Sequence, residues 1–176
     1  MRKSIIAILM TFCLSIMTYA QTPRDRATEL KQAQSSLNQK DYIKARYLFK
    51  KAYEAFATRE NYPQAIECGV QANALYVREN FYKEGFELCR DMDQLIWAGE
   101  QNQKKVFYDL RFLVNKERLR MYTALKNPAQ AKTQLNKLEE TANLAKNDSL
   151  TEVLLYTKAN YYYTFNQNTQ GDACFR

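Results

Sequence analysis

The chain has 176 residues, of which 26 are basic, 19 are acidic and none is histidine, and its net charge is +7. Histidine is the commonest general base and metal ligand, and the sequence also lacks a glycine-rich phosphate loop and a Gly-x-Ser-x-Gly motif. We therefore expect no enzyme activity, no metal site and no cofactor. The 4 glycines and 3 prolines are too few for a many-stranded sheet, which favours an all-helical protein.

Residues 1–20 have the form of a secretory signal peptide. Arg2 and Lys3 precede an apolar stretch over residues 5–17, and Ala20 is a small residue suited to signal peptidase. The stretch is shorter than the ~20 residues that span a bilayer, so we expect cleavage after Ala20 in preference to a membrane anchor. The remaining residues 21–176 carry 24 basic against 19 acidic side chains, a net charge of +5, and have the length of one domain.

Apolar residues recur every three or four positions through this region, as on one face of a helix. The stripe is clearest at Tyr42, Ala45, Phe49, Ala52 and Phe56. The periodicity predicts seven helices and the start of an eighth near residue 171: 24–39, 42–58, 62–79, 82–97, 103–125, 128–145 and 149–167. Short links predict that the first six form three antiparallel hairpins.

Several helix ends carry recognisable signals. Gly99 is predicted to end the fourth helix, because glycine readily adopts the backbone conformation of a helix terminus. Pro128 suits the first turn of the sixth helix, where the amide that it lacks would be unpaired. Asp148 or Ser149 is predicted to cap the seventh helix.

Three cysteines remain after the signal peptide. Cys68 and Cys89 lie on consecutive predicted helices and could form a disulfide in an oxidising compartment. Alternatively both are small apolar core residues, and this reading is favoured because Cys174 would be left over in any pairing. No Cys-x-x-Cys motif occurs to suggest a zinc or redox site.

A spacing of small and apolar residues recurs at the start of alternate helices. It is clearest as Asp41-Tyr42-x-x-Ala45-x-x-x-Phe49-x-x-Ala52. Weaker copies contain Gly85 and Ala131 at the position of Ala45, and a fourth begins at Gln170-x-x-Ala173. These marker residues are 40, 46 and 42 positions apart, which indicates a stacked array of helical hairpins.

On these residues, the chain resembles the tetratricopeptide repeat (TPR) proteins over residues 24–176. Tyr76 and Tyr122 lie nine residues before their markers, where that family commonly has an aromatic residue. The resemblance implies an all-α solenoid of antiparallel hairpins with about three and a half repeats. The spacing exceeds the family's period of about 34 residues and the closing proline is absent, so a generic helical solenoid is the alternative fold.

In TPR arrays the first helix of each hairpin lines a concave groove that holds a partner. The resemblance places six candidate partner-binding residues there: Arg78, Lys116, Arg120, Lys158, Tyr162 and Phe165. The basic side chains would receive an acidic segment or a C-terminal carboxylate, and the aromatic ones would be apolar anchors. The alternative is an ordinary solvated helix face. Leu30 and Gln34 replace the lysine and asparagine of the family's chaperone clamp, so that specificity does not transfer.

The resemblance implies a non-catalytic protein–protein interaction scaffold, exported to the periplasm or outer surface of a Gram-negative bacterium. Its partner would be a protein or peptide; we expect no nucleic acid, despite a pI near 9.2, and no direct membrane insertion of residues 21–176. The fourth copy breaks off at Arg176, which predicts that the repeat domain is truncated at its C-terminus. A second function stays open, the periplasmic sensory region of a longer membrane signalling protein, either a histidine kinase or a transcriptional regulator.

Overall fold

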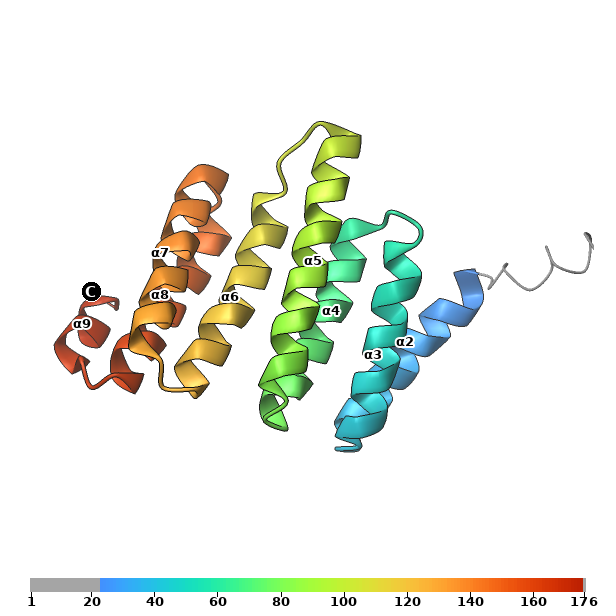
Figure 1. The fold of residues 1–176 in the computed structure, drawn as a ribbon, viewed down its shortest axis with the longest axis horizontal. Helices are drawn as coiled ribbons and strands as arrows, with labels where there is room; N and C mark the ends of the chain where they lie inside the picture. Colours follow the sequence, from blue (N-terminus) through green and yellow to red (C-terminus); the bar gives the residue numbers. More distant parts are fainter. Residues whose placement is uncertain (1–22, 176) are drawn as a thin grey trace, which may run out of the picture.

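The computed structural model describes residues 23–175, so the predicted signal peptide lies outside the described residues. These residues form helices that stand side by side in chain order (Figure 1). Their bounds are as follows: α2 (Pro23–Asn38), α3 (Tyr42–Ala57), α4 (Tyr62–Arg78), α5 (Tyr82–Gln103), α6 (Tyr108–Ala124), α7 (Pro128–Ala145), α8 (Asp148–Thr164) and α9 (Asn168–Ala173).

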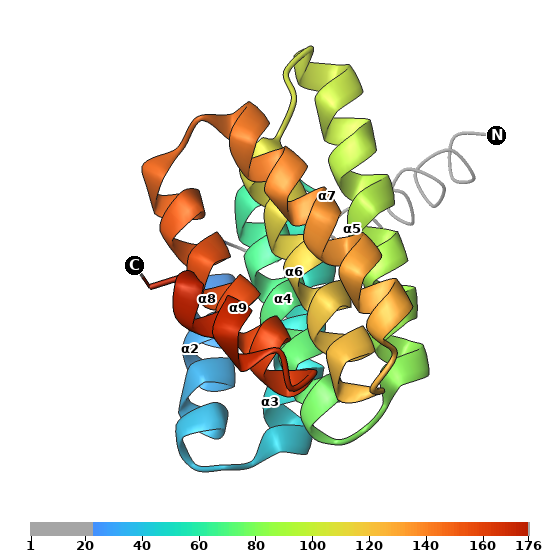
Figure 2. The same cartoon turned by 90° about the vertical axis from the view of Figure 1, so that its left-hand side faces the viewer.

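Each helix packs against the one before it, as the predicted antiparallel hairpins require. Additional contacts join α4 to α6 and α6 to α8, so the first helices of successive hairpins also touch each other. Figure 2 looks onto the C-terminal end of the array, where α9 lies against α8. Residues 23–175 contain no strand, and the arrangement is that of an all-α solenoid.

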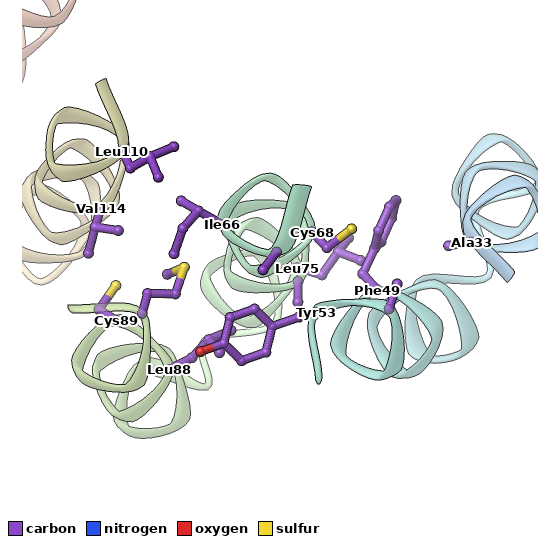
Figure 3. Close-up of a cluster of buried hydrophobic side chains, with 14 of the residues drawn as sticks. Ala33, Phe49, Tyr53, Ile66, Cys68, Leu75, Leu88, Cys89, Leu110 and Val114 are labelled. Carbon is purple, nitrogen blue, oxygen red and sulfur yellow. The ribbon is translucent and has the colours of Figure 1, made fainter. Parts of the chain in front are cut away.

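The core consists of two clusters of buried apolar side chains. The larger one extends from α2 to α6 and includes Phe49, Ile66 and Val114 (Figure 3). The smaller one joins α6, α7 and α8. Because α6 contributes to both, it connects the two halves of the array. No described helix is both long and apolar enough to cross a membrane.

Cys68 and Cys89 are buried in the larger cluster as free thiols (Figure 3). The interpretation of both as small core residues is therefore confirmed. Burial raises the pKa of Cys68 to about 11 and that of Cys89 to about 12, because a thiolate is poorly solvated among apolar neighbours.

The prediction that Gly99 ends a helix is wrong. α5 continues to Gln103, and Gly99 is buried within it. A Cβ atom on Gly99 would lie 2.8 Å from the ring of Phe107 and 2.9 Å from the ring of Tyr62. The glycine therefore allows two aromatic rings to approach the helix, and α6 begins at Tyr108 instead of residue 103.

The buried carboxylate of Glu100 fastens the α5–α6 connection. It accepts hydrogen bonds from the Phe107 N–H (2.9 Å) and Arg111 Nε (2.7 Å), and forms an ion pair with Arg111. Burial alone would raise the pKa of Glu100, but the hydrogen bonds from Arg111 and Phe107 outweigh it and hold the pKa below its usual value. The connection is thus an ordered part of the array.

The helices end without glycine. Every connection between described helices contains a non-glycine residue in the left-handed conformation, with φ between 50° and 62°: Lys40, Glu60, Asn80, Lys104, Lys126, Lys146 and Asn166. In most of them the next residue donates its N–H to a carbonyl five positions back, as Asp41 does to Ser36 at 2.9 Å. These hydrogen bonds satisfy carbonyls that the helix end leaves unpaired.

Helix starts agree in part with the predictions. Pro128 lies in the first turn of α7, as predicted. The prediction for α8 is wrong by one or two residues, because Asp148 is already helical and Asn147 is the cap. The Asn147 side chain accepts a hydrogen bond from the Ser149 N–H at 3.0 Å, since its position just before the helix lets the amide oxygen reach that donor.

Backbone hydrogen bonds show that the repeat marker lies at the same position relative to the start of each second helix. The N–H groups of Ala45, Gly85 and Ala131 each donate to the carbonyl four residues back, at 2.9–3.0 Å. In the fourth copy the corresponding donor is Gly171, at 3.1 Å, and Gly171 is buried whereas Ala173 is exposed. The predicted fourth marker is therefore wrong by two residues, and the spacings are 40, 46 and 40.

Candidate partner-binding groove

Two cavities open between the first helices of neighbouring hairpins. One of about 260 Å³ lies between α2 and α4, and one of about 330 Å³ lies between α6 and α8. Between α4 and α6 this face is bridged by polar side chains instead. The groove predicted from the sequence therefore consists of two hollows separated by a bridge.

Four groups make that bridge. The amide Nδ2 of fully buried Asn73 donates to Glu117 Oε2 at 3.1 Å. Arg120 donates to the Ala74 carbonyl at 3.0 Å and lies 3.5 Å from the same Glu117 oxygen. Glu117 is only 2% exposed, and a carboxylate buried to this degree needs partners, which Arg120 and the Asn73 amide provide. These contacts hold α4 and α6 in one relative position.

The cavity between α6 and α8 contains two of the six predicted residues. Lys116 and Arg120, four positions apart on α6, both line it. The other lining residues are Glu117, Leu119, Thr123, Thr157, Asn160 and Tyr161. The structure therefore brings two basic side chains of α6 together with polar groups of α8.

Lys116 supplies an unpaired positive charge to this cavity. Its side chain is half-buried, and its ammonium group has no ion pair or hydrogen bond with any residue of the described part of the chain. A partly desolvated cation without a partner gains from binding an anion. Arg120, which is 44% exposed, lies beside it, and its charge is balanced by Glu117.

The structure places Lys158, Tyr162 and Phe165 away from this cavity. The Lys158 ammonium lies 2.7 Å from Glu139 on α7, and that hydrogen bond raises the pKa of Lys158. Tyr162 and Phe165 pack against Tyr161, with ring centroids 5.3 Å and 5.0 Å apart. These three residues belong to the contact of α8 with its neighbours.

The predicted residues of α8 miss the cavity because the marker of the fourth repeat was placed two residues too late. Counting back from Ala173 aligned Lys158 with Lys116, whereas counting back from Gly171 aligns Tyr156 with Lys116 and Asn160 with Arg120. A shift of two residues turns a helix by about 200°, which moves a side chain from one face to the opposite one.

Arg78 also lies apart from Lys116 and Arg120. It is at the C-terminal end of α4, and its guanidinium stacks 3.9 Å from the centre of the Tyr42 ring at the start of α3. Arg78 therefore belongs to the turn at one edge of the array, and it does not line the cavity between α6 and α8.

Sequence reasoning missed Thr157, Asn160 and Tyr161. One signal could have found them, because Tyr162 lies nine residues before Gly171, just as Tyr76 precedes Gly85 and Tyr122 precedes Ala131. The burial of Glu117 could not be predicted from its own helix, because its partner Asn73 is 44 positions away.

Other hollows lie outside the predicted groove. One of about 420 Å³ is lined by α5, α6 and α7, including exposed Trp97, and another of about 860 Å³ lies beside the α5–α6 connection. Of the basic residues that line the first, Arg118 and Arg111 are paired with Asp93 and Glu100, and Lys137 is exposed. Within residues 23–175, no cluster of three metal-ligating side chains occurs.

Comparison of the chain with protein families, curated proteins and solved structures finds no match.

Proposed function

We propose that the protein is a non-catalytic interaction scaffold built from TPR-like repeats, exported to the periplasm or cell surface. Its concave face would bind an extended peptide segment whose carboxylate enters the cavity between α6 and α8. The observation that supports this is the half-buried, unpaired ammonium of Lys116 beside Arg120 in a hollow of about 330 Å³. Helical arrays of this kind commonly act by presenting such surfaces.

The polar groups around the cavity suit a peptide. The Asn160 amide and the Thr123 hydroxyl offer donors and acceptors to a main chain, while Leu119 and Tyr161 supply apolar contact. A carboxylate bound by Lys116 would form a charge-assisted hydrogen bond, and such bonds contribute about 1.5–3 kcal/mol.

The proposal is tested by selecting ligands from a displayed random-peptide library and measuring their affinity by fluorescence anisotropy. Selected peptides are expected to carry Asp, Glu or a free C-terminal carboxylate. Lys116→Ala should weaken their binding by roughly tenfold or more, since it removes one charge-assisted hydrogen bond. Adding Arg120→Ala should weaken binding further, because the charge of Glu117, which Arg120 balances, would then repel a carboxylate.

A matched control removes the same amount of charge elsewhere. Lys50→Ala with Arg90→Ala changes two exposed side chains on α3 and α5 that have no partner among the described residues. This double variant should retain the affinity of the wild type. Selected peptides without any carboxylate preference, or unchanged affinity in Lys116→Ala, would refute the proposed site.

A further inference from the structure

The turns that join the first helix of a hairpin to the second lie along one margin of the array, at the bottom of Figure 1. The first three comprise residues 38–44, 78–84 and 124–130. Each exposes one large apolar side chain: Ile43 is 68% exposed, Phe81 45% and Leu125 47%. Isolated apolar side chains are common on protein surfaces, but a row of them along one edge is a feature of this array.

The same three turns are rich in unpaired positive charge. Their exposed basic residues are Lys40, Lys44, Arg78, Lys83 and Lys126. None of the four lysine ammonium groups has an ion pair or hydrogen bond with the described residues, and the exposed acids are only Asp41 and Glu84. Glu79 is neutralised by its ion pair with Arg46. We call these five basic and three apolar residues the basic edge.

The opposite margin does not share this composition. Its turns, residues 58–64, 103–109 and 146–150, contain four basic residues but also Glu60, Asp109 and Asp148. Val106 is the large apolar side chain exposed there. The two margins are built from the same kind of turn, so the difference between them lies in the side chains.

The shape of the basic edge favours a bilayer over a protein as its partner. None of the cavities described above is lined by a residue of this edge. A protein partner requires complementary shape, whereas a lipid headgroup layer deforms around separate protruding side chains. Lysines interspersed with exposed apolar residues match a surface that is negatively charged outside and apolar beneath.

We propose that the basic edge adsorbs to the surface of an anionic phospholipid bilayer, with Ile43, Phe81 and Leu125 at the level of the headgroups. The array would stand on the membrane by its turns, without inserting a helix. The cavity between α6 and α8 is lined by residues outside these turns, so it would remain open to a peptide.

The left-handed backbone of Lys40 and Lys126 provides a variant that removes charge without harming the fold. Both have positive φ, 62° and 53°, a conformation that costs glycine less steric strain than lysine because glycine has no Cβ. Lys40→Gly with Lys126→Gly should therefore keep or increase stability. Its binding to vesicles of phosphatidylcholine with about one-third phosphatidylglycerol, measured by co-sedimentation at low salt, should be roughly 25-fold weaker than wild type.

The matched control is Lys104→Gly with Lys146→Gly on the opposite margin. Both residues also have positive φ, 50° and 51°, so the backbone change and the loss of charge are the same. This variant should bind the vesicles as the wild type does. All variants retain residues 1–22, so any contribution of that segment is common to them.

A second arm tests the apolar contacts. Ile43→Ser should weaken binding to the same vesicles several-fold, whereas Leu144→Ser, at a 53% exposed residue of α7, should not.

Three results would overturn the proposal. The wild type could bind phosphatidylcholine vesicles as well as anionic ones, or both glycine pairs could weaken binding equally, which would indicate a response to net charge alone. Finally, the wild type could fail to bind vesicles while Lys40→Gly with Lys126→Gly abolishes its binding to an acidic protein. That result would assign the basic edge to a protein partner.

Discussion

Burial decides the chemistry of individual cysteines in this chain. Cys68 is 2% exposed and Cys89 is fully buried, while Cys174 is half-buried near the end of the described residues. The sequence could place two of them on neighbouring helices but left a disulfide open. The distinction needed the packing, since a pair of buried cysteines on consecutive helices need not be bonded.

Thiol labelling tests this assignment at the level of residues. With pKa values of about 11 and 12, Cys68 and Cys89 are almost entirely protonated at pH 8. We expect iodoacetamide to modify Cys174 in the folded protein, and to modify Cys68 and Cys89 only after denaturation, as read by peptide mass spectrometry. Rapid labelling of either buried thiol, or a Cys68–Cys89 disulfide in the non-reduced digest, would contradict the structure.

Among the connecting elements, the α5–α6 connection is held by a buried carboxylate. Glu100 holds both the Phe107 N–H and the Arg111 guanidinium, so it ties the end of α5 to the start of α6. The second spacing in the array is 46 residues, against 40 for the first, because α5 has 22 residues where α3 has 16.

The Glu100 link should make stability depend on pH. Because its pKa is lowered in the folded state, Glu100 stabilises the fold above its unfolded pKa of about 4.3, and this stabilisation disappears as pH falls through the lower folded value. Glu100→Gln should lower the free energy of unfolding by about 2 kcal/mol at pH 7, measured by urea denaturation. The difference from wild type should shrink below about pH 4.

Glu87→Gln is the control for this titration. Glu87 is an exposed carboxylate of the same helix with no partner among the described residues, so its variant should match the wild type at every pH. If the deficit of Glu100→Gln were independent of pH, the ionised carboxylate would not be the stabilising species.

For the whole molecule, the two core clusters imply uneven cooperativity. A solenoid is stabilised by contacts between neighbouring repeats, and only α6 belongs to both clusters here. A local loss of packing should therefore loosen the part of the array that contains it first.

Leu135→Ala tests this expectation. Leu135 is fully buried in the smaller cluster, and its truncation should cost about 3 kcal/mol. Amide hydrogen exchange should accelerate throughout α7, α8 and α9, while α3 and α4 retain their protection. Ile66→Ala, in the larger cluster, should give the reverse distribution. Uniform acceleration in both variants would mean that the array unfolds as a single unit.

The existence of the helices and their order could be predicted from periodicity, because an apolar stripe such as the one from Tyr42 to Phe56 requires its helix to bury one face. The first marker residues, Ala45, Gly85 and Ala131, were found for the same reason. What failed depended on distant contacts. Gly99 serves the rings of Tyr62 and Phe107, and only their approach reveals that α5 continues past it.

The candidate site divides in the same way. Lys116 and Arg120 share a helix face because they are four residues apart, which the chain determines by itself. Whether α8 presents Lys158 or Asn160 to them depends on the rotation of that helix, and this is set by the turn at Asn166 and by Gly171 packing under Tyr163. Local sequence thus determined the elements and their amphipathic faces. Tertiary packing decided the rotation of the helices, the buried Asn73–Glu117 bridge and the cavity between α6 and α8, because only contact between distant helices selects one orientation.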